Sequence, residues 1–155
     1  MKKLIPFLLA LCCLILCACA SKPKEKAAVP EPEALAAELL ASGAFSEELG
    51  AVEDVVARTI YVLTEHEVAS IRLYSSSGAV SEEIAIFPCA DETAAGKALT
   101  ECSARLELQK RLYADYKPEE VPKLEKALVV QRGSTVVLCV AADAGKAKAV
   151  LDKYF

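Results

Sequence analysis

Two stretches of the sequence carry the same order of local signals, and this order limits the folds open to the chain. In the first, apolar and polar residues alternate from Val68 to Tyr74, turn-forming residues follow at 75–78, and a second apolar run covers Val80–Phe87. Alternation is typical of a strand with one buried face, and a Ser/Gly cluster between two such runs predicts a β-hairpin. Pro88 ends the second run.

A long helix is predicted after this hairpin. Asp91 has a side chain suited to a helix N-cap, because its carboxylate can accept a hydrogen bond from a free backbone N–H. Apolar residues then recur at helical spacing from about Glu92 to Tyr113.

The second stretch repeats this order nearer the C-terminus. Strands are predicted at Leu128–Gln131 and Thr135–Ala141, with a turn at 132–134 between them and Asp143 as the cap of a last helix. We therefore predict an α+β fold with a four-stranded antiparallel sheet packed with helices. A ββα repeat would explain the likeness of the two stretches. Two unrelated helix starts that share the common Asp cap would explain it equally well.

Two shorter helices are predicted before the first hairpin. Apolar residues from Leu35 to Leu40 lie on one face of a helix that begins near Pro32, and Gly43 stands where a C′ residue belongs. From Val52 to Leu63, apolar residues together with Thr59 recur at i, i+3, i+4, i+7, i+8 and i+11. This spacing fits a helical stripe, although several of the residues favour strands.

The N-terminus has the pattern of a secretory signal peptide. Two lysines precede an apolar run from Leu4 to Leu16, which is shorter than the roughly 20 residues that span a bilayer. The sequence Leu-Cys-Ala-Cys at 16–19 resembles the lipobox of bacterial lipoproteins. This resemblance implies cleavage after Ala18 and attachment of a diacylglycerol to the thiol of Cys19. An ordinary signal peptide that happens to contain cysteines is the alternative.

The predicted organisation has three parts. Residues 1–18 form the lipoprotein signal peptide, residues 19–33 the lipidated cysteine and a flexible tether, and residues 34–155 a single extracytoplasmic domain. Loss of Lys2 and Lys3 with the signal peptide would take the net charge from −4 to −6. Lipid rather than a basic patch would then supply membrane attachment, and nucleic acid is not expected as a partner.

Three stretches together resemble a known family. They are Ser77–Phe87, the corner Asp115–Glu119 with the sequence Asp-Tyr-Lys-Pro-Glu, and Gly133–Leu138 leading to Asp143. In combination they are similar to the bacterial lipoproteins of domain-of-unknown-function family 4358, over roughly Leu35–Phe155. The resemblance implies a lipid-anchored extracytoplasmic domain. It implies no activity, so no catalytic residue can be inferred from it.

Few residues are candidates for catalysis. His66 is the only histidine, and no metal-ligand or nucleophile motif surrounds it, so we expect a solvated loop residue. Glu82 and Glu83 would point to opposite faces of a strand and could not act as a facing carboxylate pair. A salt bridge, for instance with Arg72 on the paired strand, is favoured over general acid or base chemistry.

Three cysteines would remain in the mature chain besides the lipidated one. Cys89, Cys102 and Cys139 all stand among apolar neighbours. We expect them to be buried small hydrophobic side chains, although one pair could be oxidised outside the cytoplasm. A thiolate pair between Cys89 and His66 would need a contact that nothing in the sequence predicts.

These observations favour a non-catalytic envelope binding or assembly module over a small envelope hydrolase or thiol enzyme. The reason is that no nucleophile, base and orienting residue stand at usable spacing. Neither a cofactor nor a metal is expected, and the partner expected besides the membrane is another envelope protein. The candidate binding surface is an acidic patch suited to a basic or cationic partner. It comprises Glu82, Glu83, Asp115, Tyr116, Pro118 and Glu119.

Overall fold

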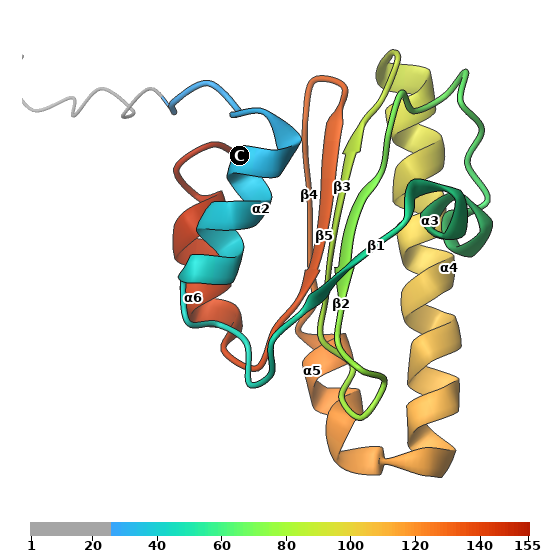
Figure 1. The fold of residues 1–155 in the computed structure, drawn as a ribbon, viewed down its shortest axis with the longest axis vertical. Helices are drawn as coiled ribbons and strands as arrows, with labels where there is room; N and C mark the ends of the chain where they lie inside the picture. Colours follow the sequence, from blue (N-terminus) through green and yellow to red (C-terminus); the bar gives the residue numbers. More distant parts are fainter. Residues whose placement is uncertain (1–25) are drawn as a thin grey trace, which may run out of the picture.

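The computed structural model describes residues 26–155, so the predicted signal peptide and Cys19 lie outside the described residues. The described chain forms a five-stranded antiparallel sheet with helices on both faces (Figure 1). The α+β class is confirmed, but the predicted number of strands was one too few. In residues 26–155, no helix has the length and apolar character needed to cross a membrane.

The strands are β1 (Gly50–Val52), β2 (Arg72–Ser75), β3 (Glu83–Pro88), β4 (Leu128–Arg132) and β5 (Thr135–Val140), in the spatial order β1-β2-β3-β5-β4. The α-helices are α2 (Pro32–Ala41), α3 (Asp54–Tyr61), α4 (Glu92–Tyr116), α5 (Val121–Glu125) and α6 (Ala144–Leu151), and a short 3-10 helix, η1, covers Pro118–Glu120.

The strand register defines two ends of the sheet that matter for function. Glu83 lies opposite Ser75 of β2 and Val140 of β5, and we call this the Glu83 end. Pro88 lies opposite Thr135, next to the tight β4–β5 turn, and we call this the Pro88 end.

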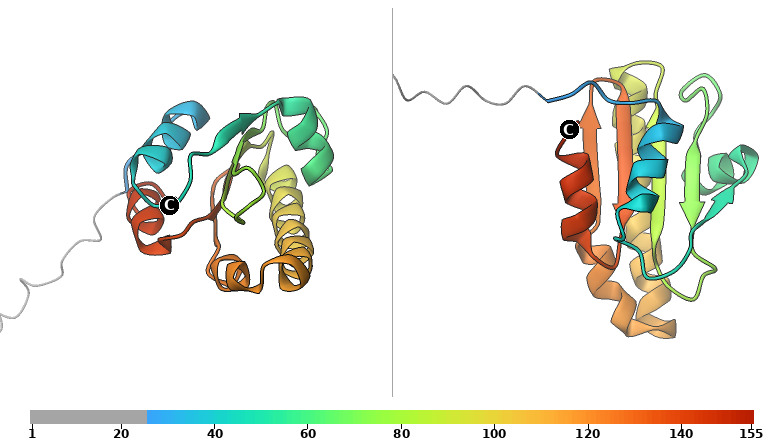
Figure 2. Two further views of the ribbon diagram at one scale, coloured as in Figure 1. Left: turned by 60° about the horizontal axis from the view of Figure 1, so that its bottom comes forward. Right: turned by 60° about the vertical axis from the view of Figure 1, so that its left-hand side comes forward.

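Each face of the sheet carries its own apolar core. Ala85 and Phe87 pack with α3 and α4, whereas Ile84 and Ile86 pack with α2 and α6. Figure 2 shows α4 on one side of the sheet and α2 and α6 on the other. Because β3 is covered on both faces, its sequence is a continuous apolar run rather than a strict alternation.

Several predicted element boundaries are confirmed by their end residues. The carboxylate of Asp91 accepts from the N–H of Ala94 at 2.8 Å, and that of Asp143 accepts from the N–H of Lys146 at 3.1 Å. Gly43 follows α2 with a φ of +70°, a conformation that a residue without Cβ adopts at little cost. The long helix runs three residues beyond the predicted end, to Tyr116.

The structure does not show a ββα repeat. The two stretches do share the order strand, strand, capped helix, and their inner strands β3 and β5 are antiparallel neighbours. A two-fold axis that relates such neighbours is normal to the sheet and would keep both helices on one face. Helices α4 and α6 instead lie on opposite faces.

The predicted helix between Val52 and Leu63 is correct in type but not in its extent or buried face. Its first residue, Val52, is instead the last residue of β1, which pairs with β2 and is the strand that the prediction missed. Helix α3 buries Ala57 and Tyr61, while Val55 is 66% exposed. The valines are thus on the solvent side, because the tyrosine ring fills the space above the sheet.

Strands β2 and β3 are shorter than predicted because side chains bind the backbone groups next to them. Arg58 of α3 donates to the carbonyls of Val68 and Ala69, and Asp54 accepts from the N–H of Ile71 at 2.6 Å. These groups are therefore not available for a continuous ladder. The loop before β3 is held in a similar way by residues of the candidate site.

Candidate functional site

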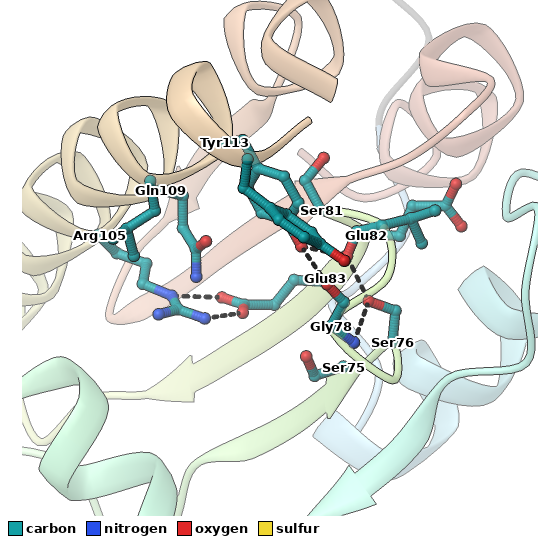
Figure 3. A pocket seen from close by; sticks show the side chains of 12 residues that line it. Ser75, Ser76, Gly78, Ser81, Glu82, Glu83, Arg105, Gln109 and Tyr113 are labelled. Atoms are coloured by element: carbon teal, nitrogen blue, oxygen red, sulfur yellow. Dashed lines mark hydrogen bonds and ion pairs between the residues drawn. The ribbon is translucent and has the colours of Figure 1, made fainter. Parts of the chain in front are cut away.

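A cleft of about 420 Å³ opens at the Glu83 end of the sheet, between the β2–β3 loop and the C-terminal half of α4 (Figure 3). Both hydroxyl and apolar groups face it. The lining residues are Ser75, Ser76, Gly78, Val80, Ser81, Glu82, Glu83, Arg105, Gln109, Leu112, Tyr113 and Tyr116.

The floor of the cleft is a buried ion pair between β3 and α4. Arg105 donates to the Glu83 carboxylate from Nη2 at 2.6 Å, and Tyr61 of α3 donates its hydroxyl to the same carboxylate. Gln109 completes the arrangement, because its amide oxygen can accept from the guanidinium at 2.6 Å. Burial, followed by the nearby Glu83 charge, raises the pKa of Tyr61 well above its usual value, so the phenol remains a donor.

A second buried network holds Glu82 beside the cleft. Its carboxylate accepts from the backbone N–H of Ser46 at 2.8 Å and from the ammonium of Lys123 at 3.0 Å. Burial alone would raise the pKa of Glu82, but the hydrogen bonds from Ser46 and Lys123 outweigh burial and lower it.

Lys123 also joins this network to Glu120. The ammonium lies 2.9 Å from the Glu120 carboxylate, which accepts from both the N–H and the hydroxyl of Ser81 at 3.0 Å. The pKa of Glu120 is lowered because these contacts outweigh the effect of burial. One lysine therefore bridges two buried carboxylates that flank the same loop.

The β2–β3 loop is attached to the end of α4 by further hydrogen bonds. The hydroxyl of Tyr113 donates to the Val80 carbonyl at 2.6 Å, and the ammonium of Lys117 donates to the Ala79 carbonyl at 3.0 Å. The loop thus forms a fixed wall of the cleft, because its backbone carbonyls have partners on the helix.

The buried negative charges around the cleft are matched by an equal number of positive charges. Three buried carboxylates, those of Glu82, Glu83 and Glu120, are paired with three cations, those of Arg105, Lys117 and Lys123. The floor and inner wall therefore present hydrogen-bonding groups without net charge.

The rim of the cleft is apolar and exposed. Tyr116 is 71% exposed and Leu112 is 56% exposed, and together with Leu108 they form a row at i, i+4 and i+8 on α4. Large apolar side chains gathered beside a concave surface are a common mark of a binding site.

The structure brings together part of the predicted surface. Glu82, Glu83 and Tyr116 line the cleft, with the two carboxylates buried and the tyrosine at the rim. Asp115 and Glu119 are exposed in the corner next to it but do not line the cleft. Pro118 begins η1, directly after α4, as expected for a proline that stops a helix.

Sequence reasoning missed the α4 side of the cleft, and it misassigned the salt bridge. Arg105, Gln109, Leu112 and Tyr116 recur at i, i+4, i+7 and i+11, a spacing that could have indicated one shared helix face. Arg72 pairs with Glu33 of α2 at 2.9 Å instead of with Glu82 or Glu83. The register explains this, since Arg72 lies opposite Ile86, at the other end of β3 from Glu83.

The remaining candidate groups lie elsewhere. His66 is exposed in a turn, as predicted. Cys89, Cys102 and Cys139 are buried and none forms a disulfide. Burial raises the pKa of Cys89 to about 11 and that of Cys102 and Cys139 to about 12. Within residues 26–155, no group of three His, Cys, Asp or Glu side chains could hold a metal ion.

A family model described as a domain of unknown function, DUF4358, matches residues 42–141, more than half of the chain. The chain belongs to the DUF4358 family. The matched range contains all five strands and every residue that lines the cleft. The search of curated proteins and the search of solved structures each found no match.

Proposed function

We propose that this DUF4358 protein is a non-catalytic binding or assembly module of a bacterial cell envelope, held at the outer face of a membrane by a lipid on Cys19. The cleft at the Glu83 end is its binding site. The observation that carries the proposal is the combination of an exposed apolar rim at Leu112 and Tyr116 with a floor whose charged groups already have internal partners.

This combination favours recognition over chemistry. General acid or base catalysis needs a group whose pKa lies near the working pH and whose proton can reach a substrate. Glu82 and Glu120 have lowered pKa values and are paired with Lys123, so they remain ionised and engaged. They hold the β2–β3 loop in place instead.

The pairing of the buried charges also indicates which kind of partner each part of the surface suits. A basic partner, as the sequence suggests, would meet the exposed carboxylates of Asp115 and Glu119 on the corner, since Glu82 and Glu83 already have cations. The cleft itself suits an uncharged segment that offers hydrogen bonds on one side and apolar surface on the other. A segment of another envelope protein meets this description.

A small envelope hydrolase or thiol enzyme is the second candidate. It would need an activated nucleophile, and the raised pKa of Cys89 keeps that thiol protonated at neutral pH. The Cys89 thiol lies 3.5 Å from the Phe87 carbonyl, and His66 is exposed in a turn. A turnover assay abolished by Cys89→Ser or His66→Ala would establish the enzyme instead.

Lipid attachment has a direct test. Mass spectrometry of the mature N-terminus should find a diacylglycerol on Cys19 and no residues 1–18. An unmodified Cys19, or an intact N-terminal segment, would refute the anchor.

Crosslinking in intact cells followed by identification of bound proteins tests the binding site. We expect Tyr116→Ala and Leu112→Ser to remove one crosslinked partner, because both side chains form the rim. Val55→Ser is the matched control, since Val55 is equally exposed but lies on α3. If both rim variants keep every crosslink of the unmodified protein, the cleft is not the binding site.

A further inference from the structure

The segment that precedes α2 is hydrogen-bonded to the end of β4 and to the C-terminal residues. The N–H of Ala27 donates to the Lys153 carbonyl at 3.0 Å. Arg132 donates from Nη1 to the carbonyl of Ala27 and, at 2.7 Å, to that of Tyr154. Val29 packs against the core between the sheet and helices α2 and α6. We call residues 26–29 the strap.

The strap lies at the opposite end of the domain from the cleft. Arg132 is the last residue of β4 and pairs with Thr135, which lies opposite Pro88. The cleft opens at the Glu83 end and is bordered by the C-terminal half of α4. Figure 1 shows the entering chain at one end of the sheet and the β2–β3 loop, with the end of α4, at the other.

The tether between Cys19 and the strap is shorter than the distance between the two ends of the domain. Helix α4 has 25 residues and is therefore about 37 Å long. Residues 19–25 can span at most roughly 25 Å, whereas a tether that ran from 19 to 33 could span roughly 50 Å. Attachment of the strap thus halves the predicted tether. The tether leaves the domain at the Pro88 end, because Glu31 and Pro32 at the start of α2 also lie beside Pro88.

From these contacts we infer that the strap orients the domain on its membrane, with the Pro88 end toward the lipid and the cleft facing away from it. This inference rests on the proposed lipid attachment at Cys19. Its consequence is that the cleft does not bind the headgroups of the anchoring bilayer. The partner is a protein segment that reaches the domain from the far side.

Energy transfer to acceptor lipids in vesicles tests this orientation with the full lipidated protein. A donor dye is placed through Gln131→Cys at the Pro88 end or through Glu119→Cys beside the cleft, both exposed positions. Transfer from position 131 should be about twice as efficient as from position 119, because they lie roughly 30 Å apart along the long axis of the domain. Equal transfer, or greater transfer from position 119, would overturn the inference.

A variant of the strap separates this inference from the proposed anchor. Arg132→Ala removes one of the hydrogen bonds that hold Ala27 and lengthens the free tether, so it should reduce the difference between the two transfer efficiencies while the protein still floats with the vesicles. Arg111→Ala, an exposed arginine on α4, should leave the difference unchanged. Protein that does not float with vesicles would refute the lipid anchor itself. An unchanged difference in Arg132→Ala would refute the role of the strap.

Discussion

The guanidinium of Arg105 forms two hydrogen bonds with the carboxylate of Glu83, at 2.6 Å from Nη2 and 3.4 Å from Nε. This pair joins the middle of α4 to the first residue of β3, and the Glu83 side chain is only 6% exposed. Both residues line the cleft, so the floor of the cleft is a buried ion pair that joins the sheet to α4.

Loss of Arg105 should destabilise the domain strongly. Arg105→Ala leaves the Glu83 charge buried with no cation, which costs about 3–5 kcal/mol in comparable pairs. The double variant Arg105→Met with Glu83→Met should recover part of this loss, because no unpaired charge remains. Urea unfolding followed by circular dichroism measures both. Arg111→Ala, at an exposed position of the same helix, is the control and should change the free energy of unfolding by less than about 0.5 kcal/mol. An equally small effect of Arg105→Ala would contradict the prediction.

Acid should destabilise the domain through Glu82 and Glu120. Both have pKa values lowered in the folded state from an ordinary value of 4.5. Their contribution to stability is therefore complete above pH 4.5 and is lost as the pH falls through the lower folded values. Unfolding free energies measured from pH 7 down to pH 2 should decrease over this window.

Replacement of Lys123 should weaken this pH dependence for the two carboxylates. Lys123→Met removes their shared cation, so both pKa values should rise toward the ordinary value, although the hydrogen bonds from Ser46 and Ser81 remain. The variant should be less stable at neutral pH and should lose less stability on acidification than the unmodified protein. Lys126→Met, an exposed neighbour, is the control. Parallel pH profiles for Lys123→Met and the unmodified protein would show that Lys123 does not set these pKa values.

The three cysteines of the described domain should react slowly in the native protein. Cys102 and Cys139 are fully buried and have pKa values of about 12, so little thiolate is available for a labelling reagent. Labelling followed by mass spectrometry should show modification only after denaturant is added. A cysteine introduced by Ser103→Cys on the exposed side of α4 provides the rate for an accessible thiol. Native labelling of Cys102 or Cys139 at that rate would disagree with the packing.

Val62 should be replaceable by glycine with a gain in stability. It directly follows α3 as the C-cap with φ +48°, and within residues 26–155 it is the single non-glycine residue with positive φ. The left-handed conformation strains a β-branched side chain, so Val62→Gly should raise the free energy of unfolding by about 1 kcal/mol. Val56→Gly inside the same helix should lower it by about 0.5–1 kcal/mol. Chemical denaturation distinguishes the two signs.

The types and ends of most elements could be predicted because their signals act over a few residues. The Asp91 and Asp143 side chains bind N–H groups three residues ahead, and Pro118 acts on the residue just before it. The stripe at 52–63 shows where such reasoning fails. Val52 fits a helix face as well as a strand end, and only the pairing of 50–52 with β2 makes it part of a strand.

The sequence by itself thus determined the α+β class, the hairpins, the capped helices and the acidic residues beside β3. Only the tertiary structure decided that Glu83 pairs with Arg105 rather than Arg72, that Tyr61 rather than Val55 is buried, and that the strap and the cleft lie at opposite ends. Caps and turns depend on neighbours in the chain. Ion pairs, buried faces and the position of the strap depend on which distant residues the sheet register brings together, and no local pattern encodes that register.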